Sequence, residues 1–441
     1  MGQGGYITLV NGTKSDWVKK YQHSYQMNSW NFPDTVEAMS SASVYVEWNE
    51  APFHEWGDDG GEAAYQLQGT DLEFQVQARG RNEFHLQIAF TDIATHGNPK
   101  GSVLNLGWIH NGAVNFILSG EPGCLNSSNP PISWMQSNMS LLQERTLREI
   151  CIPGSHDSGM SIYTSGTTGT NDCNTLTQST GIKGQLQYGA RYFDIRPVIS
   201  AGQYFTGHYG DLPLVDAQAG ANGQSIQSVI DDVNMFTKDN NELVILYLSH
   251  DLNTDLGFKA YAPFTQDEWN DLFHQLTGIY NLFFTQANDL TMLKLRDFIG
   301  GNRAAAVVVV VEANGISLGN YANRGFYTPA HFRLYNKYSN NNDVHSMMKD
   351  QFDKLKNKHR KVKYFLLSWT LTLSPIQVVK CAVPGVLSIR DLANIANPYL
   401  YTKLMSYCTN QCYPNILYTD NILSSDITAL AMAVNSLAAL G

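Results

Sequence analysis

The chain has 441 residues, of which 43% are hydrophobic and 15% are charged, and its formal net charge is −10. Because a single core usually stops growing at about 250–300 residues, this length predicts two domains. The excess of negative charge disfavours nucleic acid as a partner, and no apolar run approaches the ~18 residues of a membrane-spanning helix.

The first 120 residues have the alternating polar and apolar pattern of β-strands. Asn-Gly pairs at Asn11 and Gly12 and at Asn111 and Gly112 predict hairpin turns. A period of two with one polar face predicts an all-β sandwich domain over residues 1–120. Residues 121–133, rich in Pro, Gly, Ser and Asn, predict a linker. The clearest alternating segments are 43–48, 72–77 and 84–90.

From residue 134 onward, apolar strand-like runs alternate with helical stretches. Several strands that are apolar on both faces predict an α/β domain, a distorted (β/α) TIM-type barrel over residues 134–441. In such a barrel the functional residues lie at the C-terminal ends of the strands. The strand-like runs are 149–152, 192–195, 243–248, 304–311, 364–367, 386–389 and 416–418, and the helical stretches are 226–238, 266–278, 344–358 and 424–440.

Two histidines and an arginine follow the first strands of this predicted barrel. His156 and Asp157 come after the strand at 149–152, and Arg196 comes after the strand that contains Asp194. His208 lies a short distance further along the chain. Cleavage of a phosphodiester needs a base, an acid and a fixed cation. Two histidines titrating near neutrality can share the first two roles, and an arginine offers planar donors to phosphate.

These segments also resemble a known family. Residues 152–159, 188–196 and 207–208 are similar to the X-domain signature of phosphatidylinositol-specific phospholipases C of the bacterial and fungal, metal-independent type. The resemblance continues through 236–249, ends at 414–421, and implies a PLC-like phosphodiesterase. The N-terminal β region lies outside it and resembles the β-domain that precedes such catalytic domains in fungal proteins.

The resemblance implies roles for the two histidines and their carboxylate partners. His156 would be the general base, oriented by Asp420, and His208 would be the general acid, supported by Asp157.

The resemblance also implies a role for Arg196, which has Asp194 beside it. Arg196 would bind the phosphoryl oxygens, where metal-dependent relatives place calcium. We therefore expect neither a metal nor another cofactor.

The choice of headgroup stays open. In the family a tyrosine stacks under the inositol ring, and Tyr338 matches it, but Asn336 stands where the motif has an aspartate. Two basic positions of the family are replaced, one by Ser249 or His250 and the other by Glu312. The alternatives to a phosphatidylinositol-like substrate are another phosphodiester, such as a sphingolipid or a glycerophosphodiester, and a catalytically inactive protein that binds a lipid or glycan.

The expected partner is a phospholipid at a membrane surface. Residues 1–6 have no signal-peptide character, so peripheral membrane contact, or secretion by a route not visible in the sequence, is compatible with the chain. Aromatic residues near the N-terminus indicate either a lipid- or glycan-binding face or core packing. They are Trp17, Tyr21, Tyr25, Trp30 and Phe32. Among the six cysteines, Cys381, Cys408 and Cys412 are candidates for a disulfide.

Overall fold

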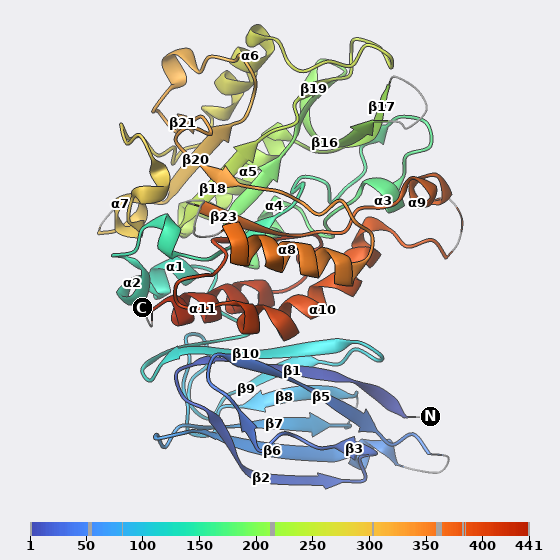
Figure 1. Ribbon diagram of the computed structural model, residues 1–441, viewed down its shortest axis with the longest axis vertical. Coiled ribbons are helices and arrows are strands. Elements are labelled where there is room, and N and C mark those ends of the chain that lie inside the picture. Colours follow the sequence, from blue (N-terminus) through green and yellow to red (C-terminus); the bar gives the residue numbers. More distant parts are fainter. Residues whose placement is uncertain are drawn as a thin grey trace. The chain divides into compact units, whose positions relative to one another are not determined.

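The computed structural model describes residues 2–51, 55–81, 83–211, 217–301, 304–358, 364–381, 383 and 385–439. The chain divides into two compact units (Figure 1). The first unit consists of Met1–Pro131, Pro398–Tyr413 and Ser425–Gly441, and the second of Ile132–Asn397 and Pro414–Ser424. Two C-terminal segments therefore belong to the same unit as the N-terminal region. A single boundary at a linker does not describe this division.

The first unit contains two β-sheets that share one hydrophobic core. Ile7, Leu9 and Val46 of one sheet and Trp17 and Phe74 of the other belong to a single buried cluster. Neighbouring strands are antiparallel, except that β1 and β10 are parallel. One sheet has the order β11 (Cys124–Ser127), β10 (Ala113–Glu121), β1 (Gln3–Thr13), β5 (Ser40–Trp48) and β3 (Ser29–Trp30); the other has the order β4 (Thr35–Val36), β2 (Trp17–Tyr25), β6 (Gly60–Leu67), β7 (Glu73–Arg79), β8 (His85–Ala89) and β9 (Val103–Gly107).

Three of the five N-terminal aromatic residues belong to this core. Trp17, Trp30 and Phe32 are buried, whereas Tyr21 and Tyr25 are about half exposed. Core packing therefore accounts for most of the aromatic pattern.

The hairpin turn predicted at Asn11 and Gly12 is wrong, because β1 continues through both residues. A Cβ atom at Gly12 would lie 2.6 Å from the Cβ of Ala433. Glycine is needed here because α11 (Asp426–Ala438) packs closely on β1. At Asn111 and Gly112 the predicted turn is present, with Asn111 at φ 57°, but the predicted hairpin is wrong, because the turn leads from β9 to β10, which belong to different sheets.

The second unit is a mixed α/β fold with a curled, parallel eight-stranded sheet. The strands follow one another in chain order around the sheet, and the last strand pairs with the first. Among the described residues, no ladder joins β21 to β22. The order is β21 (Phe326–Tyr327), β20 (Ala306–Val311), β18 (Leu243–Leu248), β14 (Tyr192–Ile195), β12 (Ile152–Ser155), β24 (Ile416–Thr419), β23 (Tyr364–Trp369) and β22 (Leu334–Tyr335).

The principal predicted helices of this region are confirmed. In α5 (Ile226–Asp239), buried residues recur with helical spacing, and the hydroxyl of Ser225 accepts from the backbone N–H of Ser228 to cap the first turn. Connecting helices and turns complete the unit. They are α1 (Trp134–Ser137), α2 (Met139–Leu142), α3 (Asp172–Thr175), α4 (Ile182–Gln187), α6 (Gln266–Leu276), α7 (Leu295–Ile299), α8 (Val344–Lys358) and α9 (Pro375–Lys380).

The strand predicted at 386–389 is wrong. Residues 386–388 form no strand, and α10 (Ile389–Tyr407) begins at the next residue. Ser388 and Asp391 exchange hydrogen bonds between side chain and backbone, which is a capping box that starts a helix. The expected cysteine pairing is also wrong, because Cys381 forms its disulfide with Cys173 of α3.

A smaller, five-stranded sheet receives the chain as it leaves β14. Pro197 follows Arg196 directly and is the first residue of β15, one of the strands of this sheet. His208 lies within β16, so it is not at the end of a barrel strand. The sheet has the order β13 (Ser165–Gly166), β17 (Gln218–Ser225), β16 (Gln203–Asp211), β15 (Pro197–Ser200) and β19 (Leu252–Asn253).

A fully buried ion pair joins the N-terminal ends of β14 and β18 in the parallel sheet. Arg191 Nε donates to Glu242 Oε2 at 3.0 Å, and neither side chain is exposed to solvent. Glu242 also accepts from the backbone N–H groups of Met135 and Gln136. Burial raises the pKa of Glu242, and Arg191 opposes this shift.

We predict that removing one partner of this pair strongly destabilises the protein. Glu242→Ala leaves a buried, uncompensated guanidinium and should lower the free energy of unfolding by about 3–5 kcal/mol. The double variant Arg191→Met with Glu242→Leu should lose less than the sum of the single changes in denaturant unfolding. Glu144→Ala, which breaks an exposed pair with Lys294, is the control and should change the unfolding midpoint little.

Candidate functional site

The carboxylate of Asp194, at the end of β14, accepts hydrogen bonds from several neighbouring elements. Its Oδ2 accepts from the Tyr418 hydroxyl at 2.6 Å, from the Asp157 backbone N–H at 3.1 Å and from Arg196 Nε at 3.2 Å. Burial raises the pKa of Asp194, but Arg196 and His156 lower it by more, so the carboxyl group stays ionised. The residue thereby fixes the ends of β12, β14 and β24 relative to one another.

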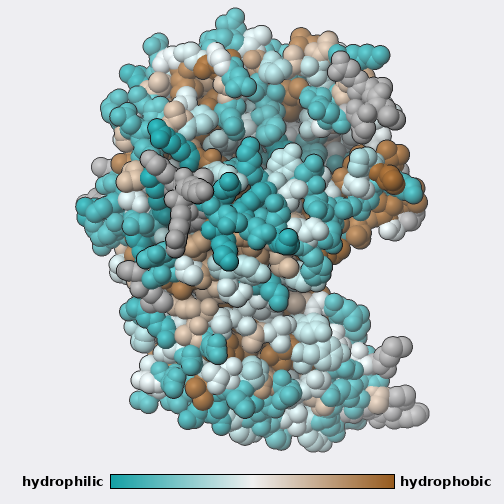
Figure 2. Space-filling model, in the orientation of Figure 1, coloured by the Kyte–Doolittle hydropathy of each residue, from teal (hydrophilic) through white to brown (hydrophobic). Residues whose placement is uncertain are grey.

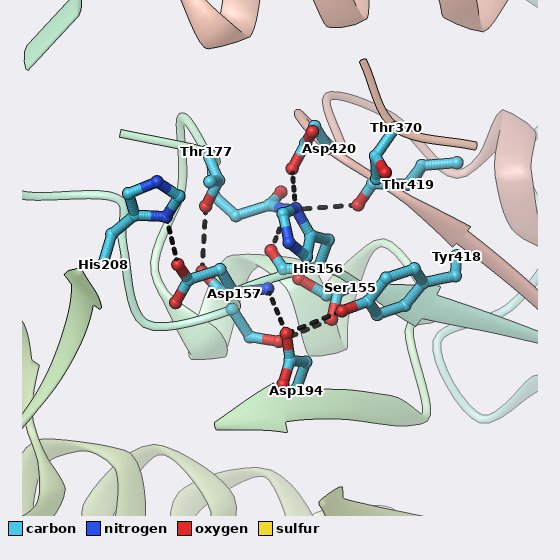
Figure 3. Close-up of polar contacts among 12 residues, drawn as sticks. Ser155, His156, Asp157, Thr177, Asp194, His208, Thr370, Tyr418, Thr419 and Asp420 are labelled. Carbon is cyan, nitrogen blue, oxygen red and sulfur yellow. Dashed lines mark hydrogen bonds and ion pairs between the residues drawn. The ribbon is translucent and has the colours of Figure 1, made fainter. Parts of the chain in front are cut away.

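His156, which follows β12, lies beside the Asp420 carboxylate (Figure 3) and also contacts the Arg196 guanidinium. Its Nδ1 is 2.6 Å from Asp420 Oδ1, and its Nε2 is 2.8 Å from a terminal nitrogen of Arg196. Because a guanidinium can only donate, Nε2 accepts, and Nδ1 carries the proton that is donated to Asp420. Burial lowers the pKa of His156, but Asp420 raises it by more, and the pKa lies above its ordinary value.

Arg196 contacts both sides of the site. Besides His156, it forms ion pairs with Asp194 at 3.1 Å and with Asp157 at 3.4 Å. Its side chain is 16% exposed, so part of the guanidinium remains accessible. Burial alone would lower the pKa of Arg196, but the two carboxylates raise it, and the group remains a permanent cation.

His208 projects from β16 toward Asp157, as Figure 3 shows. Its Nδ1 is 2.6 Å from Asp157 Oδ2, and the Asp157 side chain is fully buried. The backbone of Asp157 is left-handed, with φ 41°, a conformation that aspartate tolerates better than most residues. The Thr177 hydroxyl donates to the carbonyl of Asp157 at 2.9 Å and helps to hold this turn.

The six residues predicted to be catalytic are thus brought together as one histidine–arginine cluster. Its members are His156, Asp157, Asp194, Arg196, His208 and Asp420.

Sequence reasoning missed three residues that support the cluster. Tyr418 lies two positions before Asp420 and therefore on the same face of the strand, which is a signal that could have identified it. Gln178 donates to the carbonyls of His156 at 2.9 Å and Thr419 at 3.2 Å, and Thr177 holds Asp157. Neither Thr177 nor Gln178 lies in a recognisable motif, so the sequence contains no signal for them.

The four residues predicted to determine substrate specificity lie at or just beyond the C-terminal ends of parallel strands. Ser249 follows β18, is buried, and its hydroxyl is 3.4 Å from Asp194 Oδ1. Glu312 follows β20 and is exposed. Asn336 and Tyr338 follow β22 and are exposed; within the described chain, no hydrogen bond joins either side chain to the histidine–arginine cluster.

We predict that Asp420→Asn lowers the pKa of His156. The variant removes the negative charge that opposes the effects of burial and of Arg196, so the protonated ring is less stable and the titration midpoint of His156 moves to lower pH. Histidine NMR titration of both proteins measures the shift. An unchanged His156 midpoint would contradict the assignment.

Comparison with known proteins supports the motif analysis. No family model matches the chain. A PI-PLC X-box domain-containing protein of Dictyostelium discoideum is 28% identical over 132 residues, which are 26% of this chain and 16% of that protein. The chain therefore matches only a small part of this relative.

Two bacterial structures match about two thirds of this chain at low sequence identity, each with a TM-score below 0.5. A mutant of phosphatidylinositol-specific phospholipase C from Staphylococcus aureus has a TM-score of 0.49 at 18% identity, over 70% of this chain and 98% of that one. The enzyme from Listeria monocytogenes has a TM-score of 0.43 at 18% identity, over 66% and 95% of the two chains. The resemblance predicted from the motifs is confirmed by the Dictyostelium match: the chain is similar to proteins with a PI-PLC X domain.

Proposed function

We propose that this chain is a phosphodiesterase that cleaves the glycerol-side P–O bond of phosphatidylinositol-like phospholipids by acid–base catalysis with two histidines. The observation that carries the proposal is the histidine–arginine cluster, in which two imidazoles, each bonded through Nδ1 to a carboxylate, lie on either side of one arginine. The sequence similarity to a PI-PLC X-box protein supports the substrate class.

His156 acts as the base. Its Nε2 takes the proton of the attacking hydroxyl, which belongs to the inositol ring or to water, as the hydroxyl oxygen bonds to phosphorus. Asp420 stabilises the imidazolium that forms, because the Nδ1 proton already points at its carboxylate. The raised pKa of His156 favours this proton transfer, and activity should fall as the pH drops through that pKa.

His208 acts as the acid. Asp157 accepts from Nδ1, which leaves Nε2 to donate a proton to the departing glycerol oxygen as the P–O bond breaks. The products are diacylglycerol and either a cyclic or an open phosphate of the headgroup. The remaining proton on His156 returns to His208 through solvent.

Arg196 neutralises charge on the phosphoryl oxygens. Two carboxylates, Asp157 and Asp194, lie beside it and could suit a divalent cation, but the guanidinium already pairs with both. Within the described residues, no group of three or more His, Cys, Asp or Glu side chains is arranged to hold a metal ion. Because its guanidinium pairs with both carboxylates, Arg196 supplies the positive charge in the proposed mechanism, as the resemblance to the metal-independent family implies.

We take the first unit as a β-sandwich and the second as a distorted TIM-type barrel with one open seam. The first unit has room for a ligand of its own: a hollow of about 460 Å³ is lined by Phe32, Ala42, Val44 and Tyr45. A lipid or glycan remains the proposed ligand of this unit.

The surface of the second unit suits contact with a lipid layer. Apolar side chains gather on α9 (Figure 2), where Ile376 is 66% and Val379 is 83% exposed. The disulfide between Cys173 and Cys381 holds the end of this segment to α3. Among the described helices, none has both the length and the apolar character to cross a membrane.

We predict that His156→Ala and His208→Ala each lower turnover of phosphatidylinositol vesicles by about 10²–10⁴-fold, which is the usual effect of losing an acid or base. Phosphorus NMR of the reaction measures the rate and the product. His274→Ala, an exposed change on α6, is the matched control and should keep full activity. Near-normal turnover by either active-site variant would disprove the assignment.

We further predict that activity survives EDTA, because Arg196 supplies the positive charge at the phosphoryl group. The rate on vesicles should be the same, within error, before and after dialysis against the chelator, and added calcium should not raise it. Loss of activity with EDTA and recovery with calcium would contradict this role of Arg196.

A further inference from the structure

Glu312 lies in the same row of strand ends as Arg196. Ile195, Leu248 and Val311 are aligned across β14, β18 and β20. The next residue on each strand is therefore Arg196, Ser249 or Glu312, and backbone hydrogen bonds continue the row: Ser249 N donates to Ile195 O at 3.0 Å and Glu312 N to Leu248 O at 2.8 Å. Since neighbouring parallel strands are ~4.8 Å apart, Glu312 begins about 10 Å from Arg196.

The Glu312 carboxylate lies beside aromatic side chains. Glu312 lies close to the Tyr247 side chain, and burial together with the negative charge of Glu312 raises the pKa of Tyr247. The Tyr247 ring in turn packs against Tyr192, with ring centroids 5.8 Å apart. Glu312 itself is exposed, so its charge can meet a ligand that enters from solvent.

His250 does not neutralise the charge of the Glu312 carboxylate. Its Nδ1 is 2.8 Å from the Ser249 hydroxyl, and its backbone is left-handed, with φ 56°. Partial burial and the charge of Arg196 lower the pKa of His250, although Asp194, Asp157 and Glu312 oppose the shift. At neutral pH the ring is therefore uncharged.

The charges of the site favour a substrate with a positive group. Asp157, Asp194, Asp420 and Glu312 outnumber the cations of the site even when Arg196 and both catalytic imidazoles are counted as positive. A phosphodiester anion pairs with Arg196, and a neutral polyol can donate hydroxyl hydrogen bonds to the Glu312 carboxylate. A cationic nitrogen on the headgroup would donate hydrogen bonds to that carboxylate and also neutralise its charge, which a hydroxyl group cannot do.

We propose that Glu312, beside Tyr247, is a headgroup-specificity residue, and that it selects phospholipids whose headgroup carries a cationic nitrogen. The inference rests on the proposed phosphodiesterase function and narrows its substrate class. The nitrogen can belong to an amino alcohol or to an amino sugar linked to inositol. With an amino alcohol, water attacks phosphorus and an open phosphate leaves; with inositol, a ring hydroxyl attacks and a cyclic phosphate forms.

The test is a competition experiment with the purified full chain. Vesicles contain equal fractions of phosphatidylinositol, glucosaminyl-phosphatidylinositol, phosphatidylethanolamine and phosphatidylcholine, and phosphorus NMR follows each product. At least one lipid with a cationic nitrogen should exceed phosphatidylinositol in kcat/KM by about five- to tenfold, the value of one partly screened charge pair. The cyclic or open product then identifies which source of nitrogen is used.

Substitutions at position 312 test whether Glu312 causes the preference for headgroups with a cationic nitrogen. Glu312→Gln should bring the ratio of kcat/KM values close to one, and Glu312→Lys should reverse it in favour of phosphatidylinositol. Asp353→Lys, the same charge reversal at an exposed position on α8, should leave the ratio unchanged. A wild-type preference for phosphatidylinositol, or a ratio that Glu312→Lys does not move, would overturn the inference while leaving the proposed function intact.

If the protein cleaves none of these lipids, binding measurements still test the role of Glu312. If no lipid is cleaved, the proposed function fails, and calorimetry with glycerophosphoethanolamine, glycerophosphocholine and glycerophosphoinositol then tests Glu312 alone. Tighter binding of an amine-bearing diester that Glu312→Gln abolishes would support the specificity role. Equal binding of all three diesters would overturn it.

Discussion

The site depends on the burial of one ionised carboxylate. Asp194 is almost inaccessible to solvent, and a buried charge is tolerated only when donors surround it. Those donors are the Tyr418 hydroxyl, the Asp157 backbone and the Arg196 guanidinium, which come from three different connections of the parallel sheet. Satisfying Asp194 therefore sets the positions of the segments that carry both histidines' carboxylate partners and the arginine.

This arrangement gives the two histidine rings different hydrogen-bond partners. Arg196 can only donate hydrogen bonds, so its contact with His156 favours the base form of that ring. His208 is held through Asp157 on the other side of the guanidinium. For the proposed mechanism, this means that the hydrogen bonds needed for proton transfer from the attacking hydroxyl to His156 are already in place before substrate binds.

Sequence patterns predicted most of the features that depend on residues close together in the chain. Helical spacing identified α5, α6, α8 and α11, and the motifs identified all six members of the histidine–arginine cluster. Two of the errors arose where distant segments decide the outcome: the conformation at Gly12 is set by packing of α11, and the cysteine partner of Cys381 lies 208 residues away. Gln178 holds two backbone carbonyls from separate strand ends, a role that only the folded chain defines.

The composition of the first unit has a consequence for the order of folding during synthesis. Its strands β1 and β10 are complete once residue 121 has been made, but α11, which packs on both, begins at residue 426. At ~5–20 residues per second, roughly 15–60 s separate the two events on the ribosome. During that interval α11 cannot yet cover the face of β1 at Gly12, against which Ala433 packs in the folded protein. The first sheet to be synthesised is therefore completed by the last helix.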